Sequence, residues 1–362
     1  MNMKRILTSS IILLLAVMAA SAQYKYCDAS QFPVYGKATD KTEGRYERIP
    51  ADLKDKVRSE LVMLGSNSSG LYIRFQTNST SIGAKWHSKY GTRFMHMADT
   101  GIRGLDLYVM TEKGWKTVGT AFPTPSGEDN ENSFVSNMTK ENREYLMYLS
   151  LYDGVEDLQI RIDEDATIAA SSIESPRSGK QIVMYGTSIL QGGCCSRPGM
   201  AFTNIIGRKL DREVINLGFS GNGRLDLEIA EVMAGIADPS IYILDQVPNC
   251  TDEMIKERGE KFFRILRDAH PDVPVIFIDD PHFGNYGYDM SFTSNIDKAN
   301  SAQYELYKSL KKQGEKKIWY IKGMEMLGED NESFVDNVHY TDLGMMRYTD
   351  YIVPIIKKRM LK

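Results

Sequence analysis

Two short segments of this chain carry side chains that together could hydrolyse an ester. The segment 185–189 (Tyr-Gly-Thr-Ser-Ile) follows an apolar run and places Ser188 on a turn that a glycine begins. The segment 336–339 (Asp-Asn-Val-His) lies near the C-terminus and places a carboxylate beside an imidazole. A serine hydroxyl is a weak nucleophile until a base accepts its proton, and that base needs a group to orient it. We therefore expect Ser188 as nucleophile, His339 as base and Asp336 as the orienting carboxylate.

Each segment taken alone has a plainer interpretation. A serine directly after a strand is usually the N-cap of the following helix. A lone Asp-x-x-His segment is most often a surface turn. The catalytic interpretation depends on the fold bringing the two segments to one place.

The composition sets limits on the class of protein. The chain has 362 residues, which is long for one hydrophobic core and indicates two domains. Its 42% hydrophobic and 25% charged residues are typical of a globular protein. The net charge of −4 offers no basic surface, so we expect neither nucleic acid nor anionic membrane as a partner.

The first 22 residues have the pattern of a secretory signal. Lys4 and Arg5 precede the short apolar stretch 11–18, and the segment 20–22 (Ala-Ser-Ala) is a small-residue cleavage site. The stretch is too short to predict a membrane span, although an uncleaved anchor helix is the alternative. We expect a mature protein that begins at Gln23, is not inserted in a membrane, and works in the periplasm or outside the cell.

Residues 23–172 read as an all-β domain. Short runs of alternating or apolar residues are separated by Gly, Asn, Ser and Asp turns, a pattern typical of a β-sandwich. The expected strands are 71–75, 81–86, 105–110, 144–149 and 158–162. The segment 171–180, which contains a proline and a glycine, is the expected linker.

Residues 180–362 alternate between strand and helix patterns. The expected strands are 182–185, 214–217, 240–244, 273–278 and 317–321, and the expected helices are 200–210, 225–236, 251–267, 297–311 and 343–358. This rhythm predicts a parallel five-stranded sheet with helices on both faces. In such sheets the site lies at the carboxyl ends of the strands, where Ser188, Gly221, Asn249 and His339 would meet.

An acyl-transfer site also needs donors for the oxyanion. The glycine-rich loop 216–223 follows the second strand, and Asn249 follows the third. The loop lacks the G-x-G-x-x-G pattern and does not follow the first strand, so a nicotinamide cofactor is not expected. The alternative for Asn249 is a turn residue before a helix cap at Thr251.

The order of these blocks resembles the SGNH (GDSL-type) hydrolase superfamily over 181–362. The resemblance implies a flavodoxin-like three-layer fold, with no cofactor and no metal. It assigns Ser188 as nucleophile, His339 as base and then acid, and Asp336 as the residue that orients His339. It places the oxyanion on the backbone N–H groups of Ser188 and Gly221 and on the Asn249 side chain.

The front half carries a second resemblance. The segment 104–108 (Gly-Leu-Asp-Leu-Tyr) resembles the signature of a jelly-roll-like domain that precedes certain secreted bacterial SGNH esterases. Many relatives of that build remove acetyl groups from plant polysaccharides or related glycans, which implies an acetylated poly- or oligosaccharide substrate. We interpret His96 and Asp106 as structural residues at the domain interface.

Two departures from the family pattern bear on the substrate and the site. Thr187 replaces the acidic residue usual in the lipase-like branch, as in carbohydrate-directed branches. In the block 247–250 (Val-Pro-Asn-Cys), Cys250 replaces the usual final aspartate beside Asn249.

The loop 280–288 follows the fourth strand and is rich in aromatic residues and glycine. It could stack on a sugar or form a lid, or Tyr286 and Tyr288 could pack locally. His282 is a weaker candidate base than His339, because no carboxylate lies three residues before it. Among the cysteines, Cys194 and Cys195 show no metal-ligand spacing, and we expect a structural role for them.

The sequence thus favours a secreted serine esterase that removes acyl groups, expected to be acetyl groups, from carbohydrate esters. One alternative is a lipid or thioester acyl hydrolase. A second is a non-catalytic glycan-binding protein that uses the sandwich as its binding module.

Overall fold

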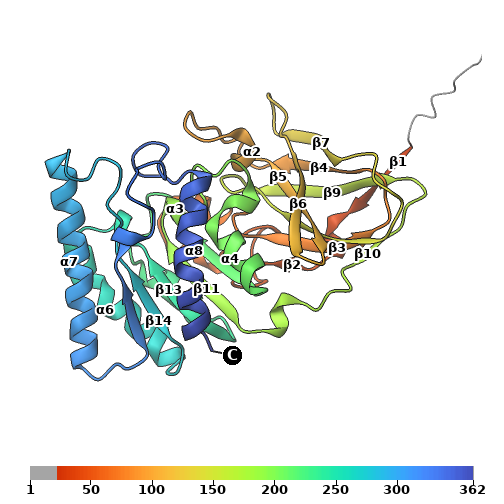
Figure 1. The fold of residues 1–362 in the computed structure, drawn as a ribbon. Coiled ribbons are helices and arrows are strands. Elements are labelled where there is room, and N and C mark those ends of the chain that lie inside the picture. The colour runs from red at the N-terminus through yellow and green to blue at the C-terminus, as the bar shows by residue number, and fades with distance from the viewer. Residues whose placement is uncertain (1–22, 362) are drawn as a thin grey trace, which may run out of the picture.

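The computed structural model describes residues 23–361, which form a β-sandwich followed by a parallel sheet flanked by helices (Figure 1). The expected signal sequence, residues 1–22, lies outside the described residues. Between residues 23 and 361, no helix has both the length and the apolar composition needed to cross a membrane.

The N-terminal half is the predicted all-β domain. One antiparallel sheet has the order β1-β9-β4-β7, and the other has the order β10-β3-β8-β5-β6, with β2 paired to β3. Apolar side chains from both sheets share one core, in which Phe75, Trp86 and Met147 are buried. The strands are β1 (Tyr24–Asp28), β2 (Val34–Tyr35), β3 (Tyr72–Thr77), β4 (Ile82–Ser88), β5 (Leu105–Thr111), β6 (Gly114–Ala121), β7 (Asp129–Val135), β8 (Arg143–Tyr148), β9 (Val155–Asp163) and β10 (Ile168–Ala170), with short helices α1 (Ser59–Gly65) and α2 (Asp99–Ile102) between them.

The C-terminal half is the predicted three-layer α/β fold. Its five strands are all parallel, in the order β12-β11-β13-β14-β15, so the first strand of this half, β11, lies inside the sheet. The elements are β11 (Gln181–Gly186), α3 (Ser188–Gln191), α4 (Phe202–Leu210), β12 (Val214–Gly218), α5 (Leu227–Ala234), β13 (Pro239–Asp245), α6 (Asp252–Ala269), β14 (Val275–Ile278), α7 (Met290–Lys312), β15 (Ile318–Ile321) and α8 (Asp342–Arg359).

Strand β11 shows why both faces of this sheet must be covered. Its side chains alternate between two separate cores, and most of the strand is buried. Ile182 and Met184 pack with helices α4 and α8, whereas Val183 and Tyr185 pack with helices α5 and α6. A parallel strand buried on both faces reads as a continuous apolar run, which is the pattern of this segment.

Helix α7 is longer than the sequence predicted. It begins at Met290 and not at Asp297, because the Asp289 side chain accepts hydrogen bonds from the backbone N–H groups of Ser291 and Phe292 and caps the helix. The cap predicted for helix α6 is confirmed, since the Thr251 side chain accepts from the Met254 N–H group.

The N-terminal half holds the end of β12 in place. The buried Arg48 guanidinium donates from Nη1 to the carbonyl oxygens of Asn216 (3.1 Å) and Gly218 (2.8 Å). Close packing of the two halves leaves no room at Gly70, where a Cβ atom would lie 2.6 Å from the Asn216 Cβ atom. These contacts therefore fix the position at which the glycine-rich loop leaves β12.

Candidate active site

Ser188 is the first residue of helix α3, immediately beyond β11. The helix cap is Thr187, whose hydroxyl accepts a hydrogen bond from the Ile189 N–H group at 3.3 Å. The simple cap interpretation of Ser188 is therefore wrong. Its Oγ instead lies 2.8 Å from the His339 Nε2 atom.

Asp336 and His339 lie in one tight turn between β15 and α8. The Asp336 Oδ1 atom accepts from the backbone N–H groups of Val338 (3.2 Å) and His339 (2.8 Å), which fixes the carboxylate against the turn. Asn337 adopts a positive φ of 70°, a conformation that asparagine tolerates better than most residues. The other oxygen, Oδ2, lies 2.7 Å from the His339 Nδ1 atom. The segment is thus a partly exposed turn, as the plainer interpretation expected, and its His339 side chain also reaches Ser188.

The charge of Asp336 sets the direction of these hydrogen bonds. Burial alone would raise its pKa, but the hydrogen bonds from the backbone and ring of His339 and from Val338 hold the pKa below its usual value. An ionised carboxylate can only accept, so Nδ1 of His339 carries the proton that donates to it. The Nε2 lone pair then faces the Ser188 hydroxyl, which donates to it. This geometry allows the imidazole to take the hydroxyl proton.

Gly221 and Asn249 follow the strands on either side of β11. Gly221 has a φ of 66°, and a Cβ atom there would meet nothing within 4 Å, so its backbone faces open space. Asn249 ends the short 3₁₀ helix Val247–Asn249 after β13, and its Oδ1 atom accepts from the Gly223 N–H group at 3.2 Å. This bond leaves the amide NH₂ of Asn249 as its remaining donor group.

Gln191 is a positioning residue that the sequence analysis did not identify. Its fully buried side chain accepts from the Ser220 N–H group (3.0 Å) and donates to the Leu151 carbonyl oxygen (3.1 Å). It therefore ties helix α3, the glycine-rich loop and the N-terminal half together. No motif or spacing marks such a residue, because its partners lie far away in the sequence.

The N-terminal half contributes directly to the surroundings of Ser188. The hydroxyl of Tyr152 donates to the Ser188 carbonyl oxygen at 3.0 Å. Asp106, buried on β5, accepts from the Gly199 N–H group at 2.9 Å and pairs with Arg197, so its predicted place at the domain interface is confirmed.

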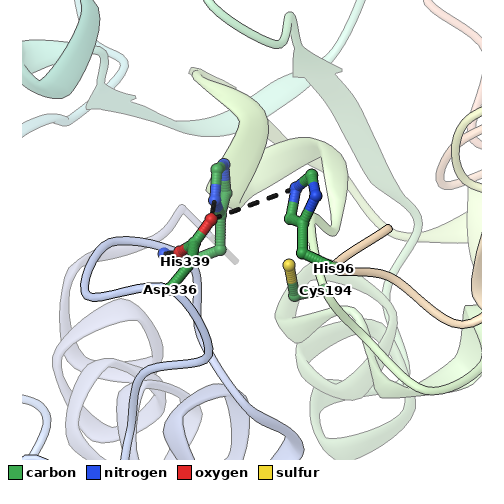
Figure 2. A group of neighbouring side chains, drawn as sticks. All are labelled: His96, Cys194, Asp336 and His339. Carbon is green, nitrogen blue, oxygen red and sulfur yellow. Dashed lines mark hydrogen bonds and ion pairs between the residues drawn. The ribbon is translucent and has the colours of Figure 1, made fainter. Parts of the chain in front are cut away.

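His96 lies beside the Asp336–His339 pair, a contact that the sequence did not predict. Its Nε2 atom is 4.0 Å from the Asp336 Oδ2 atom, and its ring centroid is 5.6 Å from that of His339 (Figure 2). The interface interpretation of His96 is therefore incomplete, because this side chain also lies beside the Asp336–His339 pair. The 240-residue range between 96 and 336 explains why the sequence alone gave no sign of this contact.

The aromatic loop after β14 packs against itself. The Tyr286 ring stacks on the His282 ring with centroids 3.7 Å apart, and its hydroxyl donates to Asp297 at 2.8 Å. The local-packing alternative therefore holds for Tyr286, and the His282 ring is part of the same stack. Tyr288 is 84% exposed.

All four cysteines are free thiols. Burial raises the pKa of Cys194 to about 12, and the negative charge of Asp336 adds to this effect. A thiol of this kind stays protonated at neutral pH, so Cys194 does not compete with Ser188 as a nucleophile.

Two family models match the chain, one on each half. Residues 179–357 match the GDSL-like lipase/acylhydrolase family, and residues 24–168 match the N-terminus of SGNH-hydrolase-type esterases. The first match covers most of the range 181–362 that resembles SGNH hydrolases, and the second contains the signature 104–108. The comparison with curated proteins gave no match.

Solved structures extend the likeness over both halves. A Bacteroides ovatus protein described as a GDSL-like lipase is 35% identical, with a TM-score of 0.88, and the match covers 94% of this chain and 99% of that one. The salicylyl-acyltransferase SsfX3 of a tetracycline biosynthetic pathway is 14% identical, with a TM-score of 0.68 and coverage of 90% and 95%. A family two carbohydrate esterase of Clostridium thermocellum, in complex with cellohexaose, is 11% identical, with a TM-score of 0.58 and coverage of 80% and 92%.

Proposed function

The chain belongs to the GDSL-like lipase/acylhydrolase family, and on this premise we propose that Ser188, His339 and Asp336 cleave carboxylic esters through an acyl-serine intermediate. Membership of the family makes the protein an esterase or acylhydrolase. The observation that supports these three residues is the continuous line of hydrogen bonds from Asp336 through His339 to Ser188, with lengths of 2.7 and 2.8 Å.

The reaction follows from the positions of these groups. His339 takes the Ser188 proton as Oγ attacks the acyl carbonyl carbon, and Asp336 stabilises the imidazolium that forms. His339 then returns the proton to the leaving alcohol. In the second half, His339 takes a proton from the water that attacks the acyl-serine. It then returns this proton to the Ser188 Oγ atom as the bond to the acyl carbon breaks and the acid leaves.

The proposed oxyanion hole consists of the backbone N–H groups of Ser188 and Gly221 and the Asn249 amide. Helix α3 begins at Ser188, and the first N–H groups of a helix lack partners within the helix. Gln191 and Asn249 both hold the backbone of the glycine-rich loop, so its N–H groups are fixed before substrate arrives. Such fixed donors stabilise charge that develops during the reaction.

Replacing Asn249 separates its two roles. Asn249→Ala should lower kcat by about 10²- to 10³-fold with a small change in KM, because an oxyanion donor acts mainly in the transition state. Asn249→Asp is the matched control, since it keeps an oxygen for the Gly223 N–H group and loses the NH₂ donor. Steady-state kinetics on an aryl acetate give kcat and KM for the two variants. If Asn249→Asp has the activity of the wild type, the side chain only supports the glycine-rich loop and is not an oxyanion donor.

We propose an acetylated poly- or oligosaccharide as the substrate. Thr187, in place of an acidic residue, supports a carbohydrate-directed branch, and the likeness in fold to a carbohydrate esterase guides the choice of substrates. We also propose that residues 1–22 direct export to the periplasm or the cell exterior, where such polymers are met. A mature protein that begins at a residue other than Gln23 would contradict the proposed cleavage.

A second candidate substrate class is a lipid or thioester with a longer acyl chain. It is favoured by the apolar side chains of Phe94 and Met95, which are exposed on the segment that leads to His96. The edge of the Phe94 ring contacts Tyr152, whose hydroxyl binds Ser188. An apolar surface this close to Ser188 could accept an acyl chain.

An acyl-length series tests the substrate proposal. We expect rapid hydrolysis of acetyl esters, little hydrolysis of octanoyl esters, and release of acetate from at least one of acetylated xylan, mannan and pectin. The Ser188→Ala protein serves as the background for each substrate. Octanoyl hydrolysis as fast as acetyl hydrolysis, with no acetate released from any polymer, would favour the lipid or thioester candidate instead.

A further inference from the structure

Four side chains, two of them in the proposed active site and two beside it, form a cluster whose chemistry goes beyond ester hydrolysis. His96, Cys194, Asp336 and His339 each offer one atom that can bind a metal, and these four atoms all lie within 4.8 Å of one another. They come from three separate parts of the chain: the segment between β4 and α2, the turn after α3, and the turn before α8. Figure 2 shows the four side chains gathered around one space.

The donor set selects a class of metal. Two imidazoles, one thiol and one carboxylate match the ligands that bind Zn²⁺ in a tetrahedral site. Mg²⁺ and Ca²⁺ prefer oxygen ligands, and this cluster offers them only one carboxylate. Cys194 and His96 are the members that the hydrolytic mechanism does not use.

The backbone holds Cys194 towards this cluster. Cys194 has a positive φ of 66°, which is uncommon for a residue other than glycine and is often found at functional sites. The turn that carries it is packed against His339, since a Cβ atom at Gly193 would lie 2.9 Å from the His339 Cδ2 atom. The turn that carries Cys194 therefore packs directly beside the His339 ring.

His96 can complete the site by a small movement. Its side chain is 44% exposed, and it lies in a segment without regular secondary structure. Its Nε2 atom is already 4.0 Å from the Asp336 carboxylate. Zn²⁺ binds nitrogen and oxygen at about 2.0–2.2 Å and sulfur at about 2.3 Å, so ligands must close around the ion, and the exposed imidazole is free to do so.

We propose that this cluster binds one Zn²⁺-class transition-metal ion and that the bound ion reversibly stops hydrolysis. Nδ1 of His339 bonds Asp336 and Nε2 bonds Ser188, so a metal on either nitrogen removes one of these two hydrogen bonds. The dication replaces the proton on the Cys194 sulfur and faces the negative charge of Asp336. The inhibition rests on the proposed function, whereas the binding does not.

The binding test compares the full chain with variants at the two ligands that hydrolysis does not use. We expect calorimetric titration with zinc sulfate to give one ion per chain, with affinity at least tenfold weaker in Cys194→Ser and in His96→Gln. Cys27→Ser and His87→Gln are matched controls, because these residues lie on β1 and β4 outside the cluster. Co²⁺ should give a thiolate-to-cobalt absorption band that only Cys194→Ser loses among the cysteine variants. Thermal melts without metal check that every variant folds.

The inhibition test uses the same proteins. Zinc should abolish aryl acetate hydrolysis by the wild type, and EDTA should restore it, while Cys194→Ser and His96→Gln keep their basal rate and resist zinc. Absence of stoichiometric zinc binding by the wild type, or unchanged zinc affinity in either variant, would overturn the site. Because calorimetry and cobalt absorption need no turnover, failure of the proposed hydrolase activity would leave the binding result intact. Zinc bound at this site without loss of a measurable hydrolysis would overturn the regulatory part.

Discussion

Replacing Ser188 with alanine is expected to lower kcat for an aryl acetate by about 10⁶-fold, the scale seen when a serine hydrolase loses its nucleophile. The substitution removes the hydroxyl that lies 2.8 Å from the His339 Nε2 atom. Without it, no acyl-enzyme forms, and only binding and oxyanion stabilisation remain. The buried position of Ser188 at the start of α3 accommodates alanine, so folding should be preserved.

The control for this prediction is Ser196→Ala. Ser196 lies nearby in the sequence, but its hydroxyl donates to Asp342 and does not contact His339. We expect Ser196→Ala to keep hydrolysis within a few-fold of the wild type. The measurement compares the initial rates of the wild type, Ser188→Ala and Ser196→Ala. A Ser188→Ala protein that retains a tenth of the wild-type rate would exclude Ser188 as the nucleophile.

Replacing Asp336 with asparagine is expected to lower kcat/KM by about 10⁴-fold. The amide lacks the negative charge that stabilises the imidazolium, and it no longer holds the proton on Nδ1 of His339. The imidazole can then present an N–H group to Ser188, which cannot accept the hydroxyl proton. The distances would change little, so the loss would reflect charge and tautomer.

The pH profile adds a second measurement for Asp336. Since hydrogen bonds hold the pKa of Asp336 below its usual value, the carboxylate stays ionised as the pH falls through the acidic range. Protonation of Asp336 should therefore not limit wild-type activity until the pH falls below the usual titration range of a carboxyl group. Asp330→Asn is the matched control, because this aspartate pairs with Arg347 in the same loop region and does not touch His339. If Asp330→Asn lowered kcat/KM as much as Asp336→Asn, Asp336 would not be the residue that orients His339.

The sequence predicted the interior strands of the sandwich and missed the edges. The five expected strands correspond to β3, β4, β5, β8 and β9, which all have neighbours on both sides. The strands β1, β6, β7 and β10 lie at sheet edges, and β2 is a two-residue strand beside β3. Edge strands are half-exposed and carry polar residues, as in the Asp-Asn-Glu-Asn-Ser run of β7, so their patterns resemble loops.

The α/β half was more predictable because its strands are buried on both faces. Their apolar runs stand out, and the rule that sites lie at the carboxyl ends of parallel strands brought Ser188 and His339 to one edge. The start of α7 was missed because its first turn after Met290 consists of serine, phenylalanine and threonine, which are weak helix formers. The Asp289 cap and the burial of Thr293 and Ile296, and not the helix propensity of these residues, extend the helix.

Apart from the interface position of Asp106, the contacts between the two halves could not be predicted from motifs. His96 lies beside Asp336, and Tyr152 donates to Ser188, although both belong to the N-terminal half. These contacts depend on how the sandwich docks on the α/β sheet, which no spacing in the sequence records. Docking also adds His96 to the cluster, whose other three members, Cys194, Asp336 and His339, belong to the α/β half.

The most direct measurement is covalent labelling of the active serine. An organophosphorus ester reacts with a serine that a base activates, and intact-mass analysis followed by peptide mapping locates the adduct. The hydrogen-bonded line from Asp336 to Ser188 predicts one adduct per chain, on Ser188, and none in the Ser188→Ala protein. An adduct on another residue, or an unlabelled protein that still hydrolyses esters, would contradict the assignment of Ser188 as the nucleophile.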